Sequence, residues 1–153
     1  MGLRQSVDQL WLDRECVAYR PSQAYTTAPV GVYTIFTITG GAILATTLMA
    51  RITGAAVGGE TIVVTCNGVA EDAGATAING AVGTVVYLPL NVGGTIINAA
   101  AIPKTIATAT TMIIGTGTGV LPGLIVATFA TGTSCTCEFA LVYKRLNPAV
   151  VVS

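Results

Sequence analysis

The sequence contains no histidine and very little charge. Charged residues make up 9% of the 153 positions, and the formal net charge is zero. Without histidine the chain lacks the usual general base, the usual partner of a nucleophilic serine or cysteine, and the commonest metal ligand. It also lacks the basic stripe with which nucleic-acid-binding proteins neutralise phosphates. We therefore expect no enzyme, no cofactor and no nucleic-acid partner.

The few charges are unevenly distributed along the chain. Six of the fourteen charged residues lie in the first twenty positions, whereas only four lie in positions 52–137. The surface of that long segment must consist largely of the small residues that dominate the composition, which includes 23 threonines, 22 alanines and 18 glycines. Solubility usually depends on interspersed charges, so a surface of this kind favours association. We predict a homo-oligomer, and specifically a trimer.

The uncharged stretch 30–50 has about the length of a membrane-spanning helix. It contains five threonines and is interrupted by Thr39, Gly40 and Gly41, which is typical of a turn between two strands. Arg20 and Arg51 flank the stretch evenly, so no positive-inside bias appears. Acidic residues also occupy the positions where a secretion signal needs an apolar region. We expect no membrane partner and synthesis in the cytoplasm.

The four cysteines are Cys16, Cys66, Cys135 and Cys137. They would permit two disulfides, but a chain without an export signal stays in a reducing compartment, so we expect free and mostly buried thiols. Cys135 and Cys137 are two positions apart in a predicted strand, which places both sulfurs on one face. This spacing is not that of a zinc knuckle, and we predict no metal. The alternative is a four-cysteine zinc site assembled from distant segments.

From position 30 onward, short runs rich in β-branched residues alternate with glycine-rich turns. This spacing predicts an all-β fold, a β-sandwich or a jelly-roll-like domain. The segments 42–50 and 105–114 also contain enough Ala, Leu and Met for a helix, but Thr and Ile dominate their neighbours and favour strands. The predicted strands are 32–39, 42–53, 61–66, 82–88, 94–102, 105–114, 124–130 and 136–146.

The last predicted strand shows the clearest alternation. Cys137, Phe139, Leu141 and Tyr143 fall on one face, and the residues between them on the other. We expect this strand to be half-buried.

Residues 1–28 differ from the rest and are interpreted as an N-terminal arm, with 29–153 as a single β-domain. Ser6 followed by Gln9 has the form of a capping box, which predicts a short helix over 7–15. Pro21 and Pro29 favour an extended linker after it. Aromatic residues and arginine are typical interface anchors, although packing of the arm on its own domain is the alternative. The predicted partner-binding residues are Leu10, Trp11, Arg14, Tyr19, Arg20 and Tyr25.

Two other motifs have the residue types of chemical sites, but their context predicts loops. Glu71 and Asp72 are adjacent carboxylates between turn residues, where solvated loop charges are usual. The glycine-rich run 115–119 lacks the Gly-Lys-Ser/Thr ending of a phosphate loop and the third glycine of a dinucleotide fingerprint. Neither motif predicts a ligand site.

Two stretches carry a resemblance to a known group of proteins. The run IFTITGGAIL at 35–44 is a strand that enters a Thr-Gly-Gly turn and an apolar strand, and FALVYKRL at 139–146 precedes a short apolar tail at 150–152. Both resemble small β-rich proteins that are encoded among the virion genes of tailed bacteriophages. The charged segment 1–28 has no counterpart in this resemblance.

The resemblance implies a head decoration or cement protein. Such a protein oligomerises, often as a trimer, on the capsid surface and binds neighbouring copies of the major capsid protein to stabilise the shell. It needs no catalytic group, and it resides in the virion after synthesis in the host cytoplasm. A tail-tube, head-fibre or minor capsid protein is the nearest alternative. From a different class, a small ligand-binding β-barrel also stays open.

Overall fold

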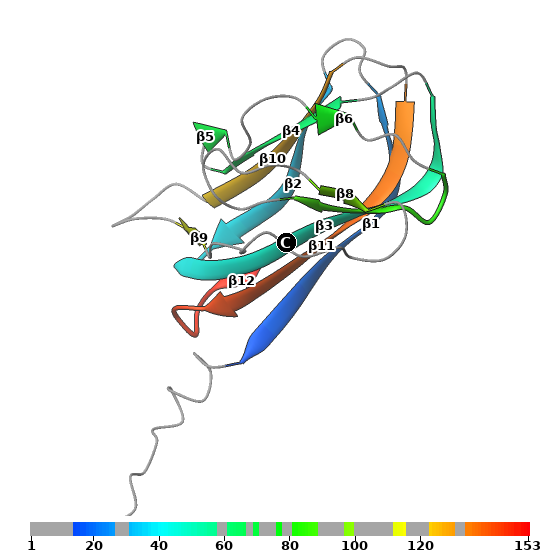
Figure 1. Ribbon diagram of the computed structural model, residues 1–153. Helices are drawn as coiled ribbons and strands as arrows, with labels where there is room; N and C mark the ends of the chain where they lie inside the picture. The colour runs from blue at the N-terminus through cyan, green and yellow to red at the C-terminus, as the bar shows by residue number, and fades with distance from the viewer. Residues whose placement is uncertain are drawn as a thin grey trace, which may run out of the picture.

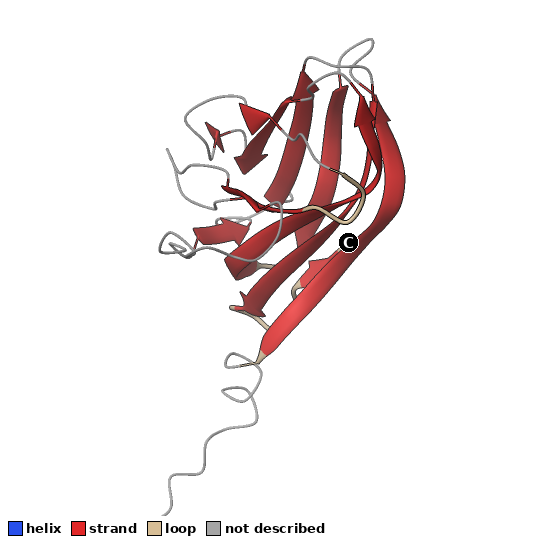
Figure 2. Cartoon of the chain, turned by 45° about the vertical axis from the view of Figure 1, so that its right-hand side comes forward, coloured by secondary structure: helices blue, strands red, loops and turns tan. Residues whose placement is uncertain are grey.

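The computed structural model describes ten segments of the chain, in which all regular structure is β-strand (Figure 2). The all-β class predicted from the sequence is confirmed. Among these residues no helix is long and apolar enough to cross a membrane. The described segments are 14–26, 31–57, 61–66, 69–70, 76–77, 81–88, 97–99, 112–115, 123–130 and 134–153.

The strands form two antiparallel sheets, and the first, sheet A, contains the longest of them (Figure 1). β11 lies in register between β1 and β3 over most of its length, so these three strands form one continuous surface. In order across the sheet the strands are β1 (Glu15–Thr26), β11 (Ser134–Arg145), β3 (Ala42–Val57), β7 (Val85–Leu88) and β8 (Ile97–Ala99), with β9 (Met112–Gly115) paired to the first residues of β3.

The second sheet, sheet B, is built from shorter strands. Its order is β12 (Val151–Val152), β2 (Gly31–Thr39), β10 (Gly123–Ala130), β4 (Thr61–Cys66) and β5 (Val69–Ala70), with β6 (Thr76–Ala77) also paired to β4. The predicted turn between β2 and β3 is confirmed, and it carries the chain from sheet B to sheet A. Gly40 makes this possible with a φ of 72°, in the left-handed region that other residues avoid.

The core lies between the two sheets and follows the alternation of their strands. β11 buries every second residue from Cys135 to Tyr143, as the sequence predicted, while the residues between them are half-buried on the other face. At one end of the core, aromatic rings pack together: Tyr25 is stacked on Phe129 at 4.8 Å, and Phe139 meets Tyr25 edge to face at 5.6 Å. Such ring pairs stabilise the fold beyond the area that they bury.

Most predicted strands are present with small changes of boundary. The segments 32–39, 42–53, 61–66, 124–130 and 136–146 correspond to β2, β3, β4, β10 and β11. The strand predicted over 82–88 begins only at Val85, because Val82 and Gly83 form a turn in which Gly83 has a φ of 95°. Of the segments 94–102 and 105–114, only 97–99 and 112–114 lie within the described residues, and both are strand.

The prediction of an extended linker after an N-terminal helix is wrong for residues 15–26. They form β1, which pairs with β11 along its length and joins the arm segment to the β-domain. The predicted helix is unsupported: Glu15 is already in the strand, and residues 7–13 lie outside the described residues. Pro21 suggested a linker, but it sits in a bulge between Arg20 and Gln23 of an edge strand, where a proline costs no ladder hydrogen bond.

Candidate protein-binding surface

The outward face of sheet A carries a continuous row of apolar side chains. Tyr19, Ala140, Met49 and Tyr87 lie directly opposite one another on four neighbouring strands. Directly opposed residues point to the same side of a sheet, so the row faces outward together. We call the row and its apolar neighbours the apolar band, which consists of Val17, Tyr19, Met49, Val85, Tyr87, Ala140 and Val142.

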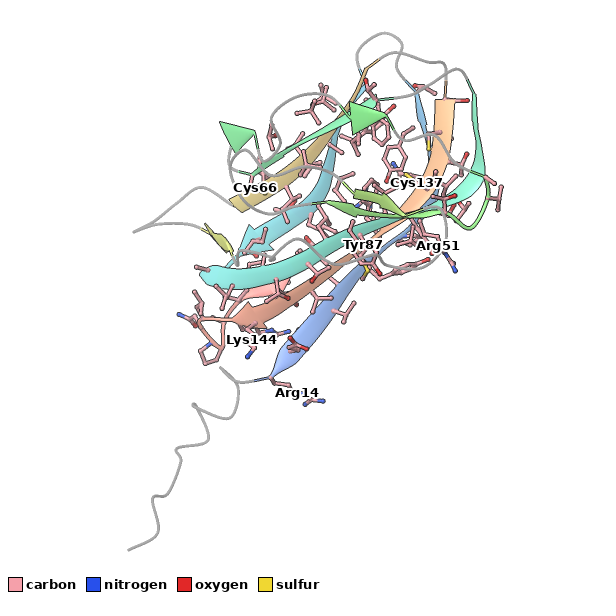
Figure 3. All side chains as sticks on the ribbon, viewed as in Figure 1. Arg14, Arg51, Cys66, Tyr87, Cys137 and Lys144 are labelled. Atoms are coloured by element: carbon pink, nitrogen blue, oxygen red, sulfur yellow. The ribbon has the colours of Figure 1, made fainter. Side chains whose placement is uncertain are left out.

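The apolar band is most exposed on β1. Val17 is 66% exposed and Tyr19 is 58% exposed, although both are large apolar residues in a regular strand. Figure 3 shows Arg51 and Tyr87 near one another where β3 and β7 run side by side, and Arg14 and Lys144 at the opposite end of the sheet. The charges thus lie towards the two ends of the band, which resembles the polar rim and apolar centre of a protein interface.

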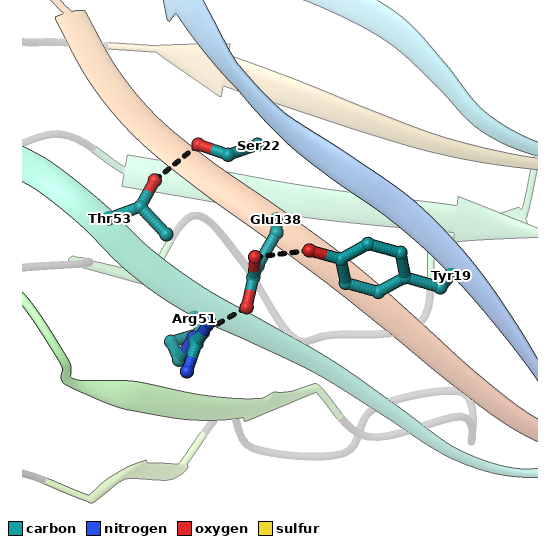
Figure 4. A network of polar contacts seen from close by, with 5 residues as sticks. All are labelled: Tyr19, Ser22, Arg51, Thr53 and Glu138. Carbon is teal, nitrogen blue, oxygen red and sulfur yellow. Dashed lines mark hydrogen bonds and ion pairs between the residues drawn. The ribbon is translucent and has the colours of Figure 1, made fainter.

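A polar network crosses three strands at one end of the band (Figure 4). The Tyr19 hydroxyl donates a hydrogen bond to Glu138 Oε2, and Arg51 Nε lies 2.5 Å from Glu138 Oε1. The Glu138 side chain is 12% exposed and that of Arg51 is 57% exposed. Beside this network, the hydroxyls of Ser22 and Thr53 are 2.5 Å apart. The network ties β1, β11 and β3 together on the outward face.

The same contacts shift the ionisation of the groups involved. The hydrogen bond from Tyr19 and the ion pair with Arg51 lower the pKa of Glu138, so this carboxylate stays charged. The hydrogen bond to Glu138 raises the pKa of Tyr19, because the phenol must keep its proton to donate it. The charges of Arg51 and Glu138 compensate each other, so a partner that covers them meets no unpaired charge.

An open hollow of about 310 Å³ lies beside this network on the outward face. This volume is at the lower limit of small-molecule pockets, and the hollow is a dent in the sheet surface and not a cavity between the sheets. Its lining combines apolar side chains with the Arg51–Glu138 pair. The residues that line it are Tyr19, Met49, Arg51, Val85, Glu138, Phe139 and Ala140.

β1 is also an edge of sheet A. It pairs with β11 on one side, and within the described part of the chain no strand pairs with its other side. Residues 15–20 run regularly along β11 before the bulge at Pro21 interrupts the pairing. An edge strand presents a row of unpaired backbone N–H and C=O groups, which another extended strand can satisfy.

The structure separates the six residues that were predicted to bind a partner. Tyr19 lies in the apolar band, and Arg14 is exposed immediately before β1. Arg20 is half-buried. Leu10 and Trp11 lie outside the described residues.

Tyr25 is not a partner-binding residue, and its prediction as one is wrong. Its side chain is 1% exposed and packs among Tyr33, Phe129 and Phe139 in the core. The hydroxyl is buried, and within the described part of the chain it has no hydrogen-bond partner of good geometry. Burial raises the pKa of Tyr25 to about 12, although the positive charge of Arg20 acts in the opposite direction.

The four cysteines all lie in described strands, and none of them is in a disulfide. Cys66, Cys135 and Cys137 are buried, and Cys16 is half-buried. Both cysteines of the C-x-C motif point into the core, as the strand geometry predicted. A hydrogen bond with Cys135 and burial raise the pKa of the Cys137 thiol well above its usual value. Among the described residues, no three His, Cys, Asp or Glu side chains are grouped closely enough to hold a metal ion.

The residues that the sequence did not reveal are those contributed by other strands. Met49, Arg51 and Glu138 meet Tyr19 only through the register of β1, β11 and β3. Residues 71–72 and 116–119, for which the sequence predicted loops without a ligand site, lie outside the described residues. No protein family matches the chain, and no curated protein sequence is significantly similar to it. Among the described residues, the apolar band and the open edge of β1 are the candidate features for binding a partner.

Proposed function

We propose that this chain is a structural protein of a tailed-bacteriophage virion, a head decoration protein that self-associates and binds the major capsid protein. The observation that carries the proposal is the apolar band on the outward face of sheet A, with Val17 and Tyr19 more than half exposed. Contiguous apolar surface in a regular sheet marks a contact surface for another protein. A cement protein needs such a surface and no catalytic group.

The energetics of the band favour a protein partner. Moving a Val side chain from full exposure to full burial contributes about 1.5–3 kcal/mol, so covering several members of the band gives a substantial gain. Covering Arg51 and Glu138 costs less than covering unpaired charges, since the two already pair with each other. The hollow between Met49 and Tyr19 is a place for a side chain of the partner to enter the surface.

The kind of particle comes from the sequence resemblance. The run 35–44 spans the end of β2, the Gly40–Gly41 turn and the start of β3, and the run 139–146 lies mostly in β11. These are the segments that resemble small virion proteins of tailed bacteriophages. Leu10 and Trp11 are proposed as additional capsid contacts next to Arg14, which is exposed where the described chain begins.

A small ligand-binding barrel has less support from the described residues. The space between the two sheets is filled by side chains, among them Ile35, Phe36, Leu48 and Phe139, all 1% exposed or less. The hollow at Tyr19 lies on the outward face and is open to solvent. A binding barrel instead encloses its ligand between or within its sheets.

The proposal is tested by sedimentation with undecorated capsids of the phage that encodes the chain. The full chain should sediment with the capsids. Ala140→Lys places a charge at the centre of the band and should weaken binding at least about tenfold, since burying an unpaired charge is costly. Val32→Lys is the matched control, because Val32 is 55% exposed on β2 of the other sheet, and it should bind normally.

Two results would count against the proposal in different ways. If the full chain does not sediment with capsids at micromolar concentration, the decoration role is wrong. If Ala140→Lys binds as well as the unaltered chain, the outward face of sheet A is not the attachment surface. Removing residues 1–13 leaves β1 intact. This truncation should weaken capsid binding without abolishing it, because the apolar band remains.

A further inference from the structure

We propose that residues 16–20 of β1 pair with the same residues of a second copy, antiparallel and about a two-fold axis, so that sheet A continues across two subunits. The inference rests on the self-association that the proposed function requires, and it names the surface responsible. Its basis is the open edge of β1 together with the side chains that this edge presents.

The edge has the chemistry that a second strand recognises. On its open side β1 presents backbone groups with no strand partner in the described part of the chain. It is regular over six residues, which is an ordinary length for a paired strand. The bulge at Pro21 then ends the pairing surface, because the proline has no N–H to donate and the strand bends there. The surface is thus limited to residues 15–20.

The two-fold axis restricts the register of the pair. For the outward faces of the two copies to form one surface, opposed residues must both be outward or both inward, so their numbers must add up to an even sum. With a sum of 34, Arg14 lies opposite Arg20 and two like charges face each other. With a sum of 38, Val17 lies opposite Pro21 and the pair runs into the bulge.

A sum of 36 pairs residues 16–20 with the same five residues of the second copy. Arg14 then no longer lies opposite Arg20, and only Glu15, at the end of the strand, lies opposite Pro21. Val17 of each copy then lies opposite Tyr19 of the other, so the two most exposed apolar residues of β1 cover one another twice. Aromatic and β-branched residues are favourable cross-strand partners. Cys16 lies opposite Arg20, Ala18 lies on the axis, and no two like charges are directly opposed. The hydrogen bond to Glu138 already holds the Tyr19 ring along the sheet, which reduces the conformational entropy that the side chain loses on pairing.

The self-complementary register identifies a second copy as the occupant of this edge. An isologous pair of this kind contains two subunits, so the assembly has an even number of copies and not the three that the sequence suggested. It also places the two apolar bands side by side on one continuous sheet. The pair would offer the capsid twice the outward face of a single chain.

The experiment is cross-linking between two variants of the full chain. Val17→Cys and Tyr19→Cys, one carrying a size tag, are mixed and oxidised. Directly opposed residues of an antiparallel pair lie about 4.5–5.5 Å apart between Cα atoms, which suits a disulfide. The mixture should give hetero-cross-links at least about five times more often than either variant alone gives homo-cross-links. Val32→Cys mixed with Tyr19→Cys is the matched control and should give few.

A mass measurement in solution accompanies the cross-linking. The unaltered chain should show twice the monomer mass, Val17→Lys should shift it to the monomer, and Val32→Lys should leave it unchanged. A monomer, a trimer or equal cross-linking in all mixtures would overturn the pairing. A monomer or trimer that still sediments with capsids would leave the decoration role intact. A dimer that gives the expected cross-links but does not sediment with capsids would support the pairing of β1 and refute the decoration role.

Discussion

Tyr25 should make the protein unstable in alkali. Its ring lies in the aromatic cluster of the core, and burial raises its pKa from about 10 to about 12. A phenol with a raised pKa holds its proton in the folded chain after the unfolded chain has lost it. The free energy of unfolding therefore falls as the pH rises from about 10 towards 12.

The magnitude follows from the size of the shift. Each pKa unit corresponds to about 1.36 kcal/mol, so a shift of two units removes about 2.7 kcal/mol once both states are ionised. At pH 11 the unfolded state is mostly ionised and the folded state mostly is not, which gives a loss of about 1.4 kcal/mol. A loss of about 1.4 kcal/mol is about a tenth to a quarter of the free energy of unfolding of an ordinary domain, which is roughly 5–15 kcal/mol.

The assay is denaturant unfolding at pH 9 and pH 11 for the unaltered chain and for Tyr25→Phe. The substitution keeps the stacked ring and removes the ionising group, so the variant should lose about 1.4 kcal/mol less between the two pH values. Tyr33→Phe is the matched control. Tyr33 contacts the same cluster, but its hydrogen bonds with Thr26 lower its pKa. Equal losses in the unaltered chain and in Tyr25→Phe would refute the reasoning.

Three further predictions concern the turns, the outward network and the thiols. Gly83→Ala should cost about 1 kcal/mol of unfolding free energy for its positive φ, and Gly40→Ala should cost more in the same denaturation assay, because its new Cβ would also press on backbone. Glu138→Gln should lower the pKa of Tyr19, followed by NMR of the tyrosine ring carbons; an unchanged pKa would remove the carboxylate as the cause. In a thiol-labelling assay, only Cys16 should react rapidly in the folded chain, whereas all four cysteines should react in denaturant.

The class of fold and most strand positions follow from the sequence alone. Alternation of apolar residues and glycine-rich turns are local signals, and they locate β2, β4 and β11 within two residues of their ends. The facing of β11 is predicted correctly for the same reason, because a strand of period two fixes which residues share a face. The turn at Gly40 and Gly41 is equally local, since it depends on two residues that tolerate positive φ.

Only the tertiary structure decides the role of residues 15–26. Their apolar and polar residues alternate only weakly, because the exposed face of this edge strand also carries the apolar residues Val17 and Tyr19. The proline in the middle indicates a linker unless a bulge is known to hold it. Pairing with β11 is what makes this segment a strand, and it buries Tyr25 while leaving Tyr19 exposed six residues earlier.

The candidate surface depends in the same way on contacts between distant parts of the chain. Tyr19 and Glu138 are 119 positions apart, and no local pattern links them. Their meeting, and that of Arg51 with Glu138, is set by the register between neighbouring strands. The sequence determines which segments of the chain form most of the strands. The order and register of those strands determine which residues gather on the outward face, because pairing is a property of the whole sheet.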